Sequence, residues 1–130
     1  KGRSLHRFDY LPKTKRTCMK TTLTRSEMEA IGKMVVALVK HWEPTDDLYD
    51  MLLHRMMQRL QTDILRKIIE PKKQYKMSWH PERALAFACI MSTQLEELKV
   101  HPFEYNLLLK LINQIHQEYA WKPEPTFSQS

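Results

Sequence analysis

The stretch Thr45–Glu70, TDDLYDMLLHRMMQRLQTDILRKIIE, carries the clearest structural pattern of the chain. Its apolar residues recur every three or four positions, which is the spacing of one face of an α-helix. The repeating positions are Tyr49, Leu53, Met57, Leu60, Ile64 and Ile68. Acidic residues stand near the start of the stretch and basic residues near its end, an order that offsets the helix dipole. The pattern predicts a long helix that ends before Pro71 and buries one face in a core.

A second helix is predicted just before this one. Thr24 and Glu27 match a capping box, in which each side chain binds a free backbone N–H group of the first helical turn. Apolar residues at helical spacing then continue to Trp42. Gly32 lies inside this helix, where it costs ~1 kcal/mol relative to alanine, and we interpret it as a mark of close contact with another helix.

Two more helices are predicted after the long one, because proline fits the first turn of a helix and breaks its interior. Pro81 and Pro102 each follow a histidine and precede an early glutamate. We expect one helix from Pro81 to about Lys99 and another from Pro102 to about Ala120. The join of two or three residues predicts an antiparallel pair.

No stretch with the strict apolar–polar alternation of a strand was recognised, so the predicted fold class is all-α. We expect a small four-helix bundle over residues 23–120. A basic extended arm, residues 1–22, precedes the bundle, and an extended proline-containing tail, residues 121–130, follows it. The segment Pro71–Ser78 is interpreted as a linker.

The net charge of +6 comes from the first twenty residues, which hold seven Lys/Arg and one Asp. The rest of the chain carries fourteen basic and fourteen acidic residues and is neutral. Such a basic block is either a surface for an anionic partner or a solvated tail. Met19 is a plausible translation start, so an open alternative is that residues 1–18 do not belong to the native protein.

Two basic clusters suggest nucleic-acid binding. The arm interleaves its basic residues with aromatic side chains that can stack on unpaired bases, and the linker adds three lysines close to Arg66 and Lys67. The candidate contacts are Arg3, Arg7, Phe8, Tyr10, Lys13, Lys15, Arg16, Lys20, Lys72, Lys73 and Lys76. Two such clusters could follow a phosphate backbone. The alternative is that the aromatic residues anchor the arm while the lysines are only solvated.

Self-association is suggested by two segments, residues 84–91 and 107–112, that are apolar almost all round. A helix without a polar face is either central or buries its second face in another chain. The candidate interaction face is Leu107, Leu108, Leu109, Leu111 and Ile112. The alternative is that the arm and the tail cover these faces.

The sequence contains no recognisable catalytic or cofactor motif. With two glycines it has no glycine-rich phosphate loop, and no Cys or His residues stand at zinc spacing. Asp47, Asp50 and His54 share one side of the long helix and could hold a metal ion. We interpret them instead as an acidic helix start with a histidine beside it. No catalytic residue, metal or cofactor is therefore predicted.

The compartment predicted from the sequence is the cytoplasm. Cys18 and Cys89 form no CxxC motif and no disulfide framework, so a reducing environment is the default. Cys89 lies in an apolar run, which predicts an unreactive thiol. The longest apolar run is eight residues, whereas a membrane span needs ~20, so no membrane association is expected.

Together these patterns predict a non-catalytic helical interaction subunit that self-associates and uses its basic arm for an anionic partner. The alternative is a nucleic-acid-binding protein of a mobile element or ribonucleoprotein that uses the arm and the Lys72–Lys76 linker. A metal-dependent enzyme at Asp47, Asp50 and His54 is a third hypothesis.

Overall fold

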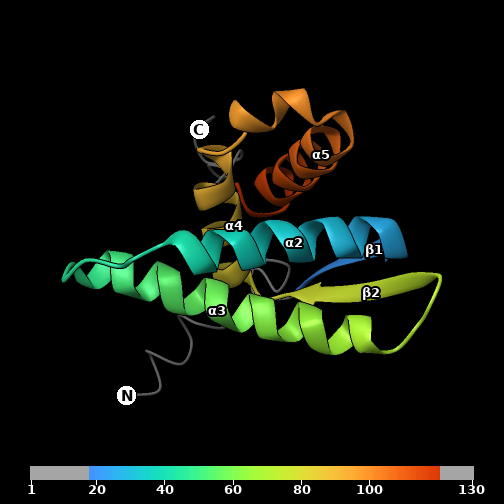
Figure 1. Ribbon diagram of the computed structural model, residues 1–130, viewed down its shortest axis with the longest axis horizontal. Helices are drawn as coiled ribbons and strands as arrows, with labels where there is room; N and C mark the ends of the chain where they lie inside the picture. Colours follow the sequence, from blue (N-terminus) through green and yellow to red (C-terminus); the bar gives the residue numbers. More distant parts are fainter. Residues whose placement is uncertain (1–17, 121–130) are drawn as a thin grey trace, which may run out of the picture.

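The structure is a computed structural model that describes residues 18–120 (Figure 1). Most of this part of the chain is helical, as predicted. In chain order the elements are β1 (Met19–Thr24), α2 (Arg25–His41), α3 (Leu48–Ile69), β2 (Gln74–Trp79), α4 (Pro81–Ser92), the 3₁₀ helix η2 (Glu97–Val100) and α5 (Pro102–Tyr119). The tail and most of the arm lie outside the described residues.

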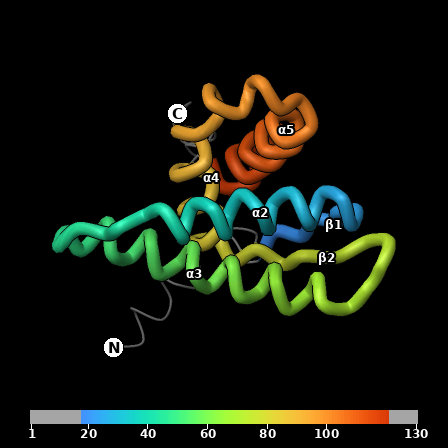
Figure 2. The backbone as a smooth tube through the Cα atoms, in the orientation of Figure 1, coloured from blue at the N-terminus to red at the C-terminus, as the bar shows by residue number. Residues whose placement is uncertain are grey.

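The helices form two pairs rather than one set with a common axis. Helices α2 and α3 lie side by side along the length of the molecule, and α4 and α5 run at an angle to them (Figures 1 and 2). One core connects both pairs and the strands, with Ile31, Ile64, Phe87 and Leu108 among its fully buried side chains. The predicted helical content is therefore present, but a two-stranded sheet joins the helices in place of a simple bundle.

The start of α2 is the capping box that the sequence predicts. The Thr24 hydroxyl accepts a hydrogen bond from the Glu27 N–H group at 3.2 Å, and the Glu27 carboxylate accepts one from the Thr24 N–H group at 2.9 Å. Leu23 and Met28 on either side of the cap are both buried. The cap thus fixes the point where the chain leaves β1 and enters the helix.

The predicted face of α3 points into the core along most of its length. Met57, Leu60 and Ile64 are fully buried there. A Cβ atom on Gly32 of α2 would lie only 3.2 Å from Ile64 Cγ2, so this glycine lets the two helices approach, as predicted. Tyr49 is the exception, because 60% of its surface is exposed and the first turns of α3 extend beyond the core.

The prediction that the chain has no strands was wrong. Strands β1 and β2 pair antiparallel, with Met19 opposite Trp79 and Thr24 opposite Gln74. Both alternate buried and exposed residues, and the alternation is readable in β2, QYKMSW, where every second residue is large and apolar. The lysines of this segment suggested a linker, and its pairing partner lies about fifty residues earlier.

The buried face of the sheet is fastened by Trp79. Its indole N–H group donates a hydrogen bond to the Thr21 hydroxyl at 2.9 Å, and both residues are buried. The Trp79 ring also packs against Phe87 of α4, with a distance of 5.2 Å between ring centroids. One side chain therefore connects both strands to the second helical pair.

The last two helices differ from the prediction at their join. Helix α4 ends at Ser92 rather than near Lys99, and turns followed by η2 lead to α5. Helix α5 begins at Pro102, as predicted. No helix within the described residues is long and apolar enough to cross a membrane.

Thr21→Val tests the hydrogen bond that fastens the sheet. Valine has the shape of threonine, but it leaves the buried Trp79 N–H group without an acceptor, which costs about 1–3 kcal/mol. We expect the free energy of unfolding in urea to fall by this amount. Thr22→Val on the exposed face of β1 is the control, and an equal loss in both variants would contradict the assignment.

Candidate functional site

The apolar face proposed for self-association lies mostly in the core of the chain. Leu107, Leu108 and Leu111 are buried, and Leu109 and Ile112 are partly buried. They pack inside the same molecule, which corrects their assignment as an interaction face. The apolar character of α5 reflects its central position.

Asp47 and Asp50, two of the residues considered for a metal site, form hydrogen bonds at the start of α3. Asp47 caps α3 by accepting a hydrogen bond from the Asp50 N–H group at 3.0 Å. The Asp50 carboxylate accepts from the Thr45 N–H group at 2.6 Å and from the Trp42 indole at 3.1 Å. Within residues 18–120 no three His, Cys, Asp or Glu side chains are placed to hold a metal ion.

These acidic residues instead fix the turn between α2 and α3. Asp50 holds both Thr45 in the turn and Trp42 at the end of α2, and the Trp42 ring meets the His54 ring edge-on with centroids 5.1 Å apart. Hydrogen bonding from the Thr45 N–H group is the main cause that lowers the pKa of Asp50 below its ordinary 3.8. In its charged form, the Asp50 carboxylate therefore links the turn to the end of α2 through hydrogen bonds.

The two cysteines lie in different surroundings. Cys89 is exposed on α4, which contradicts the expectation of a thiol shielded by an apolar run. Cys18 is half-buried, and its sulfur lies 3.5 Å from His80 Nδ1. Both thiols are free.

Basic side chains gather where the end of α3 passes β2. Arg66, Lys67 and Lys76 all line two adjacent hollows on this surface, with volumes of about 320 and 630 Å³. We call these three residues the basic surface. They come from segments nine residues or more apart in sequence, and β2 brings Lys76 back alongside the helix.

The basic surface is not neutralised by acidic side chains. The two carboxylates that line the same hollows each pair with another cation of the lining, Asp63 with Arg83 and Glu70 with Lys72. Within residues 18–120 no acidic group pairs with Arg66, Lys67 or Lys76, and all three are exposed. The surface therefore has free positive charge available to an anion.

Strand pairing adds Lys20 to this region. Lys20 lies opposite Ser78, and Thr22 lies opposite Lys76. Residues opposite each other, and residues two apart on one strand, share a face of the sheet. Lys20 and Lys76 are thus on the same exposed face, so a lysine of the predicted arm joins one of the predicted linker.

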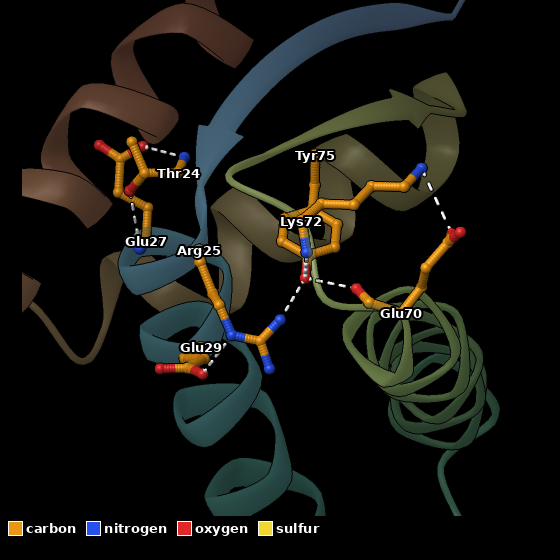
Figure 3. Close-up of polar contacts among 7 residues, drawn as sticks. All are labelled: Thr24, Arg25, Glu27, Glu29, Glu70, Lys72 and Tyr75. Carbon is orange, nitrogen blue, oxygen red and sulfur yellow. Dashed lines mark hydrogen bonds and ion pairs between the residues drawn. The ribbon is translucent and has the colours of Figure 1, made fainter.

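The loop before β2 is held by the hydroxyl group of Tyr75 (Figure 3). This hydroxyl donates a hydrogen bond to the Glu70 carbonyl at 2.7 Å and accepts one from the Lys72 N–H group at 3.1 Å. The Arg25 guanidinium also donates a hydrogen bond to the Tyr75 hydroxyl. The backbone N–H group of Arg25 donates one to the Lys73 carbonyl at 3.2 Å. The segment is therefore a fixed loop rather than the free linker that was expected.

The sequence candidates divide into three groups. Lys20 and Lys76 share the exposed sheet face, and Lys72 and Lys73 lie on the fixed loop beside it. Arg66 and Lys67 also line the basic surface; the sequence placed the linker lysines near them but did not count them among the candidate contacts. The remaining candidates lie outside the described residues: Arg3, Arg7, Phe8, Tyr10, Lys13, Lys15 and Arg16.

Asp50→Asn tests the hydrogen-bonded link between α2 and α3. The lowered pKa means that the carboxylate stabilises the fold fully above its unfolded value of 3.8 and loses this effect as the pH falls through the folded-state pKa. We expect a lower melting temperature than wild type at neutral pH, and a difference that shrinks in acid. Glu43→Gln is the control, because Glu43 is exposed and no hydrogen bond or ion pair of its side chain is found within residues 18–120. A difference independent of pH would contradict the assignment.

Tyr75→Phe tests the loop. Removing the hydroxyl leaves the Glu70 carbonyl and the Lys72 N–H group without their partner, and we expect a loss of about 1–2 kcal/mol in the free energy of unfolding. Hydrogen exchange at residues 70–74 should also become faster. Tyr105→Phe on α5 is the control, because no hydrogen bond of its hydroxyl is found in the described part of the chain. Unchanged exchange in Tyr75→Phe would rule out the tyrosine as the anchor of the loop.

The arrangement that these residues form is a fixed, exposed set of cations on a helical protein with a small sheet. It offers charge for holding an anionic group. Comparisons of the chain with protein-family models, with curated proteins and with solved structures find no match.

Proposed function

We propose that this chain is a non-catalytic helical binding subunit whose anionic partner is a nucleic acid. The observation that carries the proposal is the basic surface, where Arg66, Lys67 and Lys76 surround two adjoining hollows without acidic partners in the described residues. Cations held close together repel one another, and an anion at their centre relieves that repulsion.

An extended polyanion fits this surface better than a small acid. The hollows adjoin and share their cations, and Lys20 on the exposed sheet face and Lys73 on the fixed loop add further positive charge. A nucleic-acid strand presents phosphates at regular intervals, and each contact with a lysine or arginine releases a counterion. The fixed loop lowers the ordering cost of binding.

The predicted basic arm would extend the same contact. Lys20 on β1 belongs to that arm, and residues 1–17 precede it with six further basic side chains and two aromatic ones. Aromatic rings stack on unpaired bases, so we expect the arm to favour single-stranded regions. A role in a mobile element or ribonucleoprotein, and a cytoplasmic location, remain part of this proposal. The two free cysteines support a cytoplasmic location, because disulfide bonds are rare in a reducing compartment.

Charge reversal at the basic surface tests the proposed function. We expect Lys76→Glu to weaken binding to a fluorescent oligonucleotide of about 20 nucleotides roughly tenfold in fluorescence anisotropy, uniformly across sequences. The slope of log affinity against log salt concentration should also become shallower by about one, which corresponds to the loss of one phosphate contact. Arg66→Glu should behave alike.

Lys110→Glu is the matched control, because Lys110 is an exposed lysine on α5 that lines neither hollow. It changes the net charge equally and should have a small effect. Equal weakening by Lys76→Glu and Lys110→Glu would show that only net charge matters. Binding that does not respond to salt would exclude the nucleic-acid proposal.

A further inference from the structure

The start of α3 presents an apolar face to solvent. The exposed fractions are 80% for Leu48, 60% for Tyr49, 47% for Met51 and 56% for Leu52. We call these four residues the α3 face. Single exposed apolar residues are ordinary on a protein surface, but a contiguous group of large ones marks an interaction site.

The α3 face is built on rigid parts of the fold. Asp47 caps the helix and Asp50 staples its first turn to the end of α2. Tyr49 also contacts α4, where a hydrogen bond with the Cys89 thiol raises the pKa of the Tyr49 hydroxyl. The face is therefore held in place before any partner arrives, which limits the entropy lost on docking.

Charged residues lie on both sides of this face, with Asp46 in the turn before α3 and two arginines further along the helix. Leu48, Leu52, Arg55 and Arg59 follow one another at intervals of four, three and four residues, so they share one stripe of α3. This stripe is exposed over its length. Asp46 precedes it. Within residues 18–120, neither Asp46 nor the two arginines form an ion pair.

This order of charges is self-complementary between two antiparallel copies of α3. Leu52 lies six residues after Asp46 and seven before Arg59, so it is close to their midpoint. Turning a second copy of α3 antiparallel about an axis at Leu52 brings the acidic end of one helix to the basic part of the other. Antiparallel helices also align their dipoles favourably. A parallel arrangement would set like charges against each other.

We propose that two copies of this chain form a dimer in which the α3 helices pair antiparallel about a two-fold axis near Leu52. Such an interface is isologous, so each contact occurs twice. Leu52 of one copy packs on Leu52 of the other at the axis. Asp46 of each copy lies near Arg59 of the other at the two ends. The predicted self-association thus moves from α5 to α3.

The size of the face sets the strength expected for this dimer. Its apolar part covers about a turn and a half of α3, with one charge pair at each end, which is smaller than a standard interface, so we expect a dissociation constant on the order of 10 µM. Arg66 and Lys67 lie further along α3, away from the axis. The basic surface therefore remains uncovered in both copies.

Sedimentation velocity of the full chain tests the apolar centre of the dimer. Over roughly 1 to 300 µM protein we expect the sedimentation coefficient to rise from the monomer to the dimer value. Leu52→Glu should remain monomeric throughout. Leu65→Glu is the matched control, because Leu65 is a similarly exposed leucine of α3 (43%) outside the α3 face, and it should dimerise like wild type. Circular dichroism melts establish that both variants are folded.

A charge exchange tests the antiparallel arrangement. Asp46→Arg and Arg59→Asp should each weaken the dimer severalfold, because each sets like charges together at both ends of the interface. The double variant restores opposite charges and should recover the wild-type constant. No other occupant of the α3 face predicts this recovery.

Three outcomes would overturn the proposal. The first is a wild-type chain that stays monomeric over the whole concentration range. The second is a dimer that Leu52→Glu leaves intact or that Leu65→Glu weakens equally, since either result places the contact elsewhere. The third is a double charge variant that is no better than the single ones, which would exclude the antiparallel pairing.

Discussion

The pairing of β1 with β2 is the constraint on which the rest of this structure depends. It joins segments about fifty residues apart in sequence and closes the chain around the α2–α3 pair. The buried side of the sheet carries Trp79, which binds Thr21 across the strands and packs against Phe87 of α4. Without this pairing, neither the entry into α2 nor the exit toward α4 would have a fixed position.

The same pairing shapes the surface that we propose to bind a nucleic acid. Alternation along β2 buries Tyr75 and Met77 while Lys76 points outward, beside the last turns of α3. The buried Tyr75 then anchors the preceding loop through its hydroxyl group. One face of β2 thus contributes to the core and the other to the basic surface. A shift of one residue in the register of the strand would exchange the residues on the two faces.

Helix α3 connects the two surfaces that the proposals concern. Its middle lies in the core, its end carries Arg66 and Lys67, and its beginning extends beyond the core with apolar side chains exposed. A helix of 22 residues is about 33 Å long, so its two ends can serve different partners. A dimer through the first turns would present two basic surfaces from a single particle, which strengthens binding to a long polyanion.

The sequence by itself determined the local features of this protein. The capping box at Thr24, the start of α5 at Pro102 and the buried stripe of α3 were all predicted, because each depends on residues within one or two helical turns of each other. The basic cluster before β2 was also predicted, although Lys72–Lys76 was assigned to a linker and Arg66 and Lys67 were not counted among its contacts. The strand in QYKMSW was missed because its alternation is short and competes with the signal of its lysines.

Only the tertiary structure decided which apolar surfaces are buried and which charges meet. Leu107 and Leu52 are both apolar residues on helices, yet one is in the core and the other faces solvent, because burial depends on which elements pack alongside. Likewise Lys20 and Lys76 share one face of the sheet only through the register of strands distant in sequence. Local patterns carry no information about such long-range contacts, so the candidate site could be named residue by residue but not assembled from the sequence.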